Sequence, residues 1–230
     1  MKTMETTIFN GSNAVISPSS VESAIISDLS PNIPVYTILP YFYEDNDIYA
    51  FTKQDFSCRK DILFIGGFPH LPNVSSVKYI ISDIMPNVWK KYPDSKLYVV
   101  GYAPPKEILD LANDNVIVTG SVSTLDEYFK LAKVFLAPLT YGAGIKGKIV
   151  QAMQNGIPVV TNDVGIEGFE NIHIGKDIFV SNDTNELIDM TTNLLANNEL
   201  CETTSKNAAK YIKNNFSYTA AKTSIFNIFN

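Results

Sequence analysis

Short apolar runs, rich in β-branched and aromatic residues, alternate along this chain with longer amphipathic segments. The runs predict strands at 14–17, 35–38, 62–66, 96–101, 116–120, 134–139, 157–161 and 177–180. Most of them are too continuously apolar to alternate with a two-residue period, as expected for strands that helices cover on both faces. The pattern is typical of βαβ units and predicts an α/β fold built on a parallel sheet.

The segments between these runs predict helices. The clearest is 74–91, which places six apolar side chains on one face: Val77, Ile80, Ile81, Ile84, Met85 and Val88. Asn73 is a suitable N-cap for this helix, and Pro86 should kink or end it. Further helices are expected near 20–29, 105–113, 124–132, 147–155, 184–197 and 200–214, with one more in the tail.

The elements are unevenly distributed along the chain. Residues 1–40 hold too few for an independent core, and 41–60 show no clear period and are interpreted as a linker. Residues 61–215 carry a complete alternating set. We therefore expect the end of one α/β domain, a linker, one whole Rossmann-like domain with helices on both faces, and a final helix over 216–230.

Composition excludes some classes of function. The formal net charge is −6 and no dense Lys/Arg stripe is present, which argues against a nucleic-acid partner. No apolar run is long enough to span a bilayer, and no secretory signal is visible. Cys58 and Cys201 form no metal or redox motif, and we interpret them as reduced thiols in a cytoplasmic protein. Two histidines are too few for a His-rich metal site.

Two glycine-rich segments follow predicted strands, at the edge where open parallel sheets bind ligands. In "IGGFPHLPN", Gly66 and Gly67 end one strand. "YGAGIKGK", residues 141–148, follows another strand and opens a helix. Free N–H groups at a helix start favour an anion, and Lys146 and Lys148 add positive charge at that end. Without an anion the lysines oppose the helix dipole, so the alternative is a turn with solvated lysines.

Other chemistries find less support. Neither segment has the P-loop order or a G-x-G-x-x-G fingerprint. His70 is placed to reach a ligand from the first glycine turn, although a lone histidine in a loop more often has a structural role. Gly120 and the "SVS" after it lie at a further strand end, where backbone groups could hold a base. No Ser–His–Asp set or carboxylate pair can be assembled.

Four segments in order resemble a known family. "RKDILFIGGFPHLPNVSSVKYIISDIMPNV", "VIVTGSV" and "KVFLAPLTYGAGIKGKIVQAMQNGIPVVTNDVGIEG" resemble the donor-binding half of GT-B glycosyltransferases, specifically the large family 4. "AVISPSSVESAIISDLSPNIPVYTILP" looks like the last βα unit of the acceptor-binding half. The tail from about residue 217 looks like the helix that returns to that half.

The resemblance implies a retaining hexosyltransferase that moves a sugar from a nucleotide-diphosphate donor to a saccharide or other hydroxyl acceptor. It implies no cofactor and no metal in the site. By this analogy Lys146 and Lys148 are the catalytic phosphate ligands. Val122 would lie near the base, and backbone groups would come from the two glycine segments. The donor-binding positions it implies are Gly66, Gly67, Phe68, His70, Val122, Tyr141, Gly142, Ala143, Gly144, Ile145 and Gln151.

The sequence departs from the family in two ways. The family's two glutamates, which have seven residues between them, fall on Ala143 and Gln151, so a weaker site is expected. Most of the acceptor-binding half is missing, so we expect donor binding without efficient transfer by this chain alone. One alternative is a non-catalytic nucleotide-sugar binding module or degenerate transferase. Another is a nucleotide-sugar epimerase, for which no acid–base set is found.

Partners and location follow from the same resemblance. We expect a role in polysaccharide biosynthesis, with the protein in the cytoplasm or peripheral at the inner face of the membrane. The donor base, the sugar, the acceptor and the oligomeric state are not readable from the residues.

Overall fold

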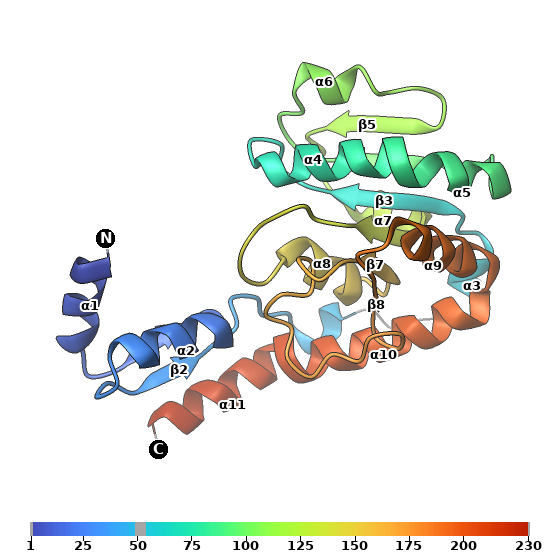
Figure 1. Ribbon diagram of the computed structural model, residues 1–230. Coiled ribbons are helices and arrows are strands. Elements are labelled where there is room, and N and C mark those ends of the chain that lie inside the picture. Colours follow the sequence, from blue (N-terminus) through green and yellow to red (C-terminus); the bar gives the residue numbers. More distant parts are fainter. Residues whose placement is uncertain (1, 49–53, 230) are drawn as a thin grey trace.

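The apolar runs form strands, and the computed structural model describes residues 2–48 and 54–229 of the chain (Figure 1). Six strands form one sheet in the order β5-β4-β3-β6-β7-β8, with every pair parallel. They are β3 (Asp61–Ile65), β4 (Leu97–Val100), β5 (Val116–Gly120), β6 (Ala132–Ala137), β7 (Val159–Thr161) and β8 (Phe179–Val180). The predicted α/β fold with a parallel sheet is confirmed.

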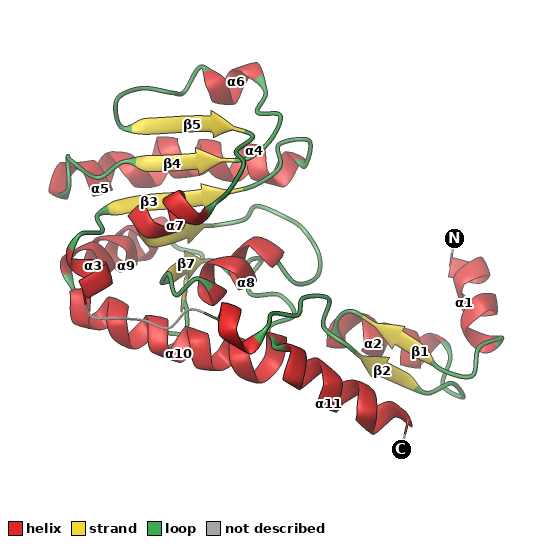
Figure 2. Cartoon of the chain, turned by 180° about the vertical axis from the view of Figure 1, so that it is seen from behind, coloured by secondary structure: helices red, strands yellow, loops and turns green. Residues whose placement is uncertain are grey.

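Helices cover both faces of this sheet (Figures 1 and 2). One face carries α4 (Leu71–Tyr79), the π-helical segment η2 (Ile80–Ile84), α5 (Met85–Lys91) and α9 (Thr184–Ala196). The other carries α7 (Asp126–Leu131), α8 (Gly147–Gln154) and α10 (Asn198–Phe216). Two further helices are short, α3 (Gln54–Ser57) and α6 (Lys106–Leu109).

The strand order reverses in the middle of the sheet. The chain moves outward from β3 to β4 and β5, then crosses back to place β6 on the other side of β3. The carboxyl ends of β3 and β6 therefore form a topological switch point, where neighbouring loops separate and leave room for a ligand.

The helix predicted over 74–91 differs from the prediction at two places. It begins at Leu71, preceded by His70, so Asn73 lies inside its first turn and the N-cap prediction was wrong. Pro86 does not end it. Since proline lacks the N–H that would bond four residues back, the helix widens before it, and Met85 donates to Ile80 five residues back. Five of the six predicted core side chains are fully buried, and Ile81 is partly buried.

The first 40 residues form a small separate sheet. It contains β1 (Val15–Ser17) and β2 (Val35–Thr37), paired in parallel, with α1 (Lys2–Asn10) and α2 (Ser20–Leu29) beside them. The Ser19 hydroxyl caps α2 by accepting from the Glu22 N–H at 3.2 Å.

A connecting segment with the short turn η1 (Asp45–Asp47) joins the two sheets, and α11 (Tyr218–Phe229) runs back toward the small one (Figure 1). Tyr43 ties this segment to the junction of α10 and α11: its N–H donates to Phe216 and its carbonyl accepts from Tyr218, both at 2.8 Å. Part of the predicted linker, residues 49–53, lies outside the described residues. The division of the chain into domains stays a prediction.

Candidate functional site

The two glycine-rich segments lie side by side at the switch point. Gly66 and Gly67 follow β3 and lead into α4, while residues 138–146 follow β6 and lead into α8. Asn73 joins them: its side-chain nitrogen donates to the Gly67 carbonyl at 2.6 Å, and its oxygen accepts from Lys148. The structure thus brings the two predicted segments into contact through Asn73 and Lys148, the last residue of each.

The backbone of the second segment requires glycine. Gly142 has φ of 139° and Gly144 has φ of 71°, in the region that residues with a Cβ rarely adopt. The turn delivers the chain to the start of α8, where no side chain caps the helix. Within the described part of the chain, no partner is found for the N–H groups of Gly147 and Lys148. Such groups at a helix start favour a negative ligand.

Lys148 is the most perturbed cation of the site. Its ammonium lies 4.6 Å from the centre of the Phe64 ring and donates to the neutral side chain of Asn73. No carboxylate among the described residues lies within ion-pair distance of it. Burial, with a smaller contribution from the nearby charge of Lys146, lowers the pKa of Lys148 to about 7. A bound anion would oppose this shift, because an opposite charge favours the protonated form of the lysine.

Lys146 is arranged differently, since it folds back on its own turn. Its ammonium donates to the Gly144 carbonyl at 2.5 Å and lies 3.6 Å from the carboxylate of Glu167. Its side chain is 9% exposed. Burial lowers the pKa of Lys146, and Glu167 opposes that shift. Lys146 therefore stabilises the turn, while Lys148 has no carboxylate partner among the described residues.

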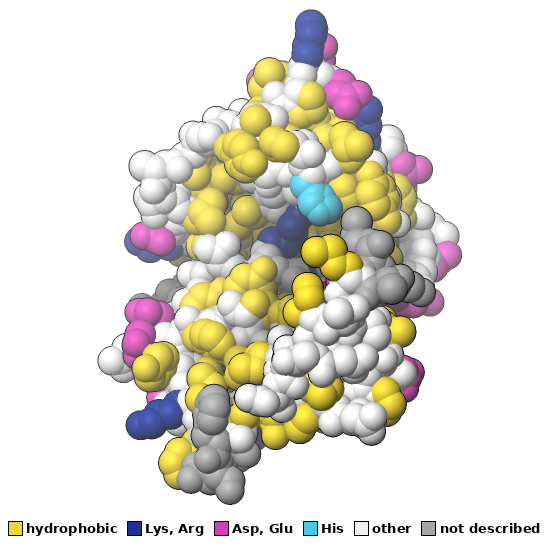
Figure 3. All heavy atoms as spheres, turned by 90° about the vertical axis from the view of Figure 1, so that its left-hand side faces the viewer, with side chains coloured by type: hydrophobic (Ala, Val, Ile, Leu, Met, Phe, Trp, Pro, Cys, Tyr) yellow, Lys and Arg dark blue, Asp and Glu magenta, His cyan; other side chains and the backbone are white. Residues whose placement is uncertain are grey.

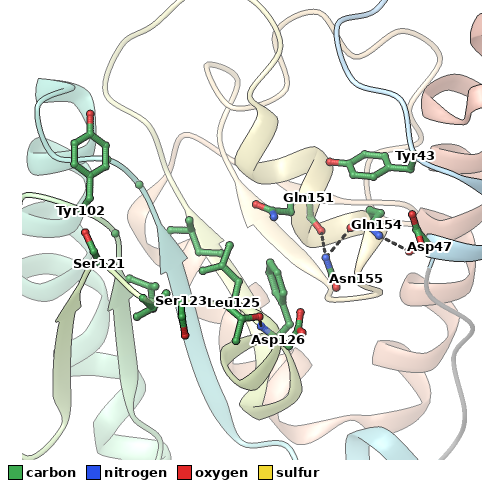
Figure 4. A pocket seen from close by; sticks show the side chains of 18 residues that line it. Tyr43, Asp47, Tyr102, Ser121, Ser123, Leu125, Asp126, Gln151, Gln154 and Asn155 are labelled. Atoms are coloured by element: carbon green, nitrogen blue, oxygen red, sulfur yellow. Dashed lines mark hydrogen bonds between the residues drawn. The ribbon is translucent and has the colours of Figure 1, made fainter.

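A pocket of about 830 Å³ opens beside these loops (Figure 4). Its walls come from the β3–α4 loop, the ends of β4 and β5, α7, α8 and the connecting segment. They include Val122, Tyr102, Ser121, Ser123 and Gln151.

Hydrogen bonds among polar residues hold one wall of this pocket in place. Gln154 donates to the Asp47 carbonyl, and Asn155 donates to Gln154 at 2.7 Å and to the Gln151 carbonyl at 2.9 Å. These contacts hold the connecting segment against the end of α8.

A second hollow of about 290 Å³ lies at the other end of α8. It is lined by Tyr41, His70, Pro72, Asn73, Leu139, Tyr141, Gly142, Ala143, Ile145, Lys146, Gly147 and Lys148. Figure 3 shows Lys or Arg side chains at the bottom of a depression on this face, next to a histidine. The β3–α4 segment and α8 contribute to both hollows, so an elongated ligand can lie across them.

The predicted site residues divide between these two places. Gly66, Gly67, Val122 and Gln151 line the larger pocket. His70, Tyr141, Gly142, Ala143, Ile145, Lys146 and Lys148 line the smaller one. Gly144 lies in the turn without lining either. Phe68 differs from the rest: its side chain is 3% exposed in the core, and its N–H already donates to the Tyr102 carbonyl at 3.1 Å.

Three residues at the site were not identified from the sequence. Asn73 was interpreted as a helix cap, and Tyr102 and Glu167 were not considered. Tyr102 packs so closely on Gly67 that a Cβ there would lie 2.6 Å from the ring. Glu167 follows β7, and its place after a strand end was the available signal.

Two searches of residues 2–48 and 54–229 gave negative results. No group of three or more His, Cys, Asp or Glu side chains is placed to hold a metal ion. No helix there combines the length and apolar character needed to cross a membrane.

Comparison with known proteins agrees with this geometry. The sequence model of a family described as "Glycosyl transferases group 1" matches residues 59–197, well over half of the chain. An uncharacterized 44.6 kDa protein in the cps region of Klebsiella pneumoniae is 26% identical over 86% of this chain and 50% of its own length. Alpha-monoglucosyldiacylglycerol synthase of Acholeplasma laidlawii is 28% identical over 52% of this chain and 32% of its own.

Solved structures show the same fold. A mutant of S. aureus TarM, in complex with fondaparinux, alpha-GlcNAc-glycerol and UDP, superposes with a TM-score of 0.78. The identity is 19%, and the match covers 100% of this chain and 46% of TarM. The GT-B resemblance is confirmed at the level of fold. The chain spans half or less of the length of these relatives.

Proposed function

The chain belongs to the group 1 glycosyl transferases, and from that premise we propose that it binds a nucleotide-diphosphate sugar and supplies the donor side of a glycosyl transfer. The observation that carries the proposal is the state of Lys148. A partly buried ammonium with a neutral hydrogen-bond partner, at the start of a helix and next to a second lysine, lacks an anion. A diphosphate provides the missing charge.

The two hollows suggest how the donor lies. The nucleoside occupies the larger pocket, between Val122 and Gln151, where the Gln151 amide can hydrogen-bond ribose hydroxyls. The diphosphate then reaches the start of α8 and Lys148. As the bond to the sugar breaks, negative charge develops on the diphosphate, and the lysines with the free N–H groups stabilise it. In this proposal these groups do the work without a metal or other cofactor.

The relatives support the class of substrates. TarM was solved with UDP and with a sugar joined to glycerol, and the name of the Acholeplasma enzyme describes a glucosylated diacylglycerol. The proposed reaction therefore uses a hexosyl donor and a hydroxyl acceptor such as a saccharide, and it retains the configuration at the sugar. The proposed role is in polysaccharide biosynthesis, in the cytoplasm or at the inner membrane face. Unpaired Cys58 and Cys201 fit a reducing compartment.

A second candidate function has its own observation. Gln151 and Ala143 give the site no carboxylate at the two positions where the resembling family has glutamates. A nucleotide-sugar binding module would need neither glutamate. The two functions separate in a transfer assay of this chain joined to an acceptor-binding half, because a binding module still holds the donor and releases no free nucleoside diphosphate in the presence of saccharide acceptors.

The test of donor binding is calorimetric titration with UDP, GDP and dTDP. We expect one of them to bind selectively, and Lys148→Ala to weaken it by about 1.5–3 kcal/mol, as for a hydrogen bond to a charged group. Lys146→Ala should cost less, since Lys146 is already paired. Lys213→Ala, an exposed lysine on α10, is the control for lost charge. A folded chain that binds none of the three overturns the proposal.

A further inference from the structure

Glu167 reaches into the lysine turn from a different strand. It belongs to the loop after β7, and one carboxylate oxygen accepts from the Gly144 N–H at 3.4 Å while the other lies 3.6 Å from the Lys146 ammonium. The two loops are in close contact, because a Cβ on Gly168 would lie 2.8 Å from the Ile145 side chain. The carboxylate is therefore held in place by the turn that it contacts.

The position of Glu167 along α8 indicates which part of a donor it would meet. Gln151, in the larger pocket, lies one turn further along the helix than Lys148, and Lys146 precedes the helix. A donor with its nucleoside beside Gln151 and its diphosphate at Lys148 extends toward Lys146. Glu167 lines neither hollow, but it lies 3.6 Å from Lys146, which lines the smaller one, so the group attached to the outer phosphate would extend toward it.

The chemistry of Glu167 does not fit a second phosphate contact. Its side chain is 36% exposed, so a ligand can reach the carboxylate. A carboxylate repels a diphosphate, but it accepts hydrogen bonds from neighbouring hydroxyl groups, and charge strengthens those bonds. Within the described residues, Glu167 is also the one carboxylate within ion-pair distance of either site lysine.

We propose that Glu167 binds the hydroxyl groups of the donor sugar and makes the site prefer the sugar-bearing nucleotide over the free nucleoside diphosphate. This rests on the proposed function, because it places the donor in the two hollows. The same carboxylate would weaken the hold on the diphosphate once the sugar has left. Glu167 then acts on both ends of the cycle, in donor selection and in product release.

Paired titrations of the whole chain test this. UDP, GDP and dTDP are each compared with their glucose, N-acetylglucosamine, galactose and mannose conjugates, for the wild type and for Glu167→Gln. We expect the variant to lose about tenfold or more in affinity for the preferred conjugate. Its affinity for the free diphosphate should stay equal or rise, since a repelling charge is gone. Glu170→Gln is the matched control, with the same change of charge at an exposed residue three positions further along the same loop.

The outcomes are distinct. Parallel losses for diphosphate and conjugate would mean that Glu167 only shapes the turn, and would overturn the inference while leaving the proposed function intact. The same holds if the wild type gains nothing from any sugar, or if Glu170→Gln matches Glu167→Gln. Failure of the folded wild type to bind any nucleotide overturns the proposed function and this inference with it. Unchanged melting temperatures for both variants show that folding is not the cause.

Discussion

The ammonium group of Lys148 lies 4.6 Å from the centre of the Phe64 ring. A cation at the start of α8 therefore lies against β3, the strand that precedes the first glycine-rich segment. The ring face attracts the charge but does not replace the water that burial removes. The lowered pKa of Lys148 expresses this imbalance. Four measurable consequences follow from this site.

The stability of the fold should depend on the titration of Lys148. Its pKa is about 7 in the folded chain and near 10.4 when unfolded, so between these values the unfolded chain binds more protons. The free energy of unfolding should therefore rise with pH across this window, by at most about 1.4 kcal/mol per unit, and by less with solvent screening. Urea unfolding at pH 7 and 9.5 measures it. Lys148→Met should remove this contribution, and equal slopes for both proteins would contradict the assignment.

Binding of a nucleoside diphosphate should show the opposite dependence. The bound anion restores the charged form of Lys148, so affinity should fall as pH rises above about 7, by up to tenfold per unit. Lys148→Arg keeps its charge throughout, and its affinity should vary less. Calorimetry in buffers with different ionisation enthalpies counts the proton taken up. A wild type that takes up no proton near pH 8 would argue against Lys148 as the ligand.

Asn73 sets the charge next to Lys148. Asn73→Asp would give the lysine an anionic partner, raise its pKa and repel a diphosphate, so we expect affinity for the nucleotide to fall by about tenfold or more. Asn87→Asp is the matched control, because Asn87 accepts from Lys90 at 2.9 Å on α5, away from both hollows. Equal effects of the two variants on nucleotide affinity would show that the charge next to Lys148 does not control binding.

The turn depends on Gly144. Gly144→Ala meets no neighbouring atom within 4 Å, yet φ of 71° should cost about 1–2 kcal/mol and shift the lysines. Gly175→Ala has the same open surroundings and a φ of 81°, and Gly175 lines neither hollow. We expect similar losses of stability, measured by urea unfolding, and a loss of nucleotide binding for Gly144→Ala alone. Binding lost in both, or in neither, would rule out the turn as the cause.

The sequence was sufficient for the elements whose pattern is local. Continuous apolar runs located the eight strands of the described residues to within two residues at either end, because strands that helices cover, such as β3 and β6, are built largely from apolar residues on both faces. Lys146 and Lys148 were identified because their position at a helix start is itself unusual. Their different environments were not predictable, since these depend on which neighbour each lysine meets.

The residues that were missed act across long separations. Asn73 meets Lys148 from 75 positions away, and Glu167 meets Gly144 from 23. Near a predicted helix start, Asn73 fitted a capping role equally well, and only the folded chain decides between the two. Pro86 was recognised as a disturbance that should kink or end the helix, whereas the helix widens before it and continues.

The pairing of β3 with β6 closes a loop that contains the whole β4–β5 side of the sheet. During folding, the entropy of closing this loop is lost when β3 pairs with β6, and the same pairing brings the two glycine-rich segments together. The strands β3–β5 and the strands β6–β8 can each pair among themselves first. The lysines and Asn73 come into contact only when β3 pairs with β6. A nucleotide held by both segments binds the joined sheet and neither side alone. By mass action such a nucleotide would stabilise the state in which β3 and β6 are paired.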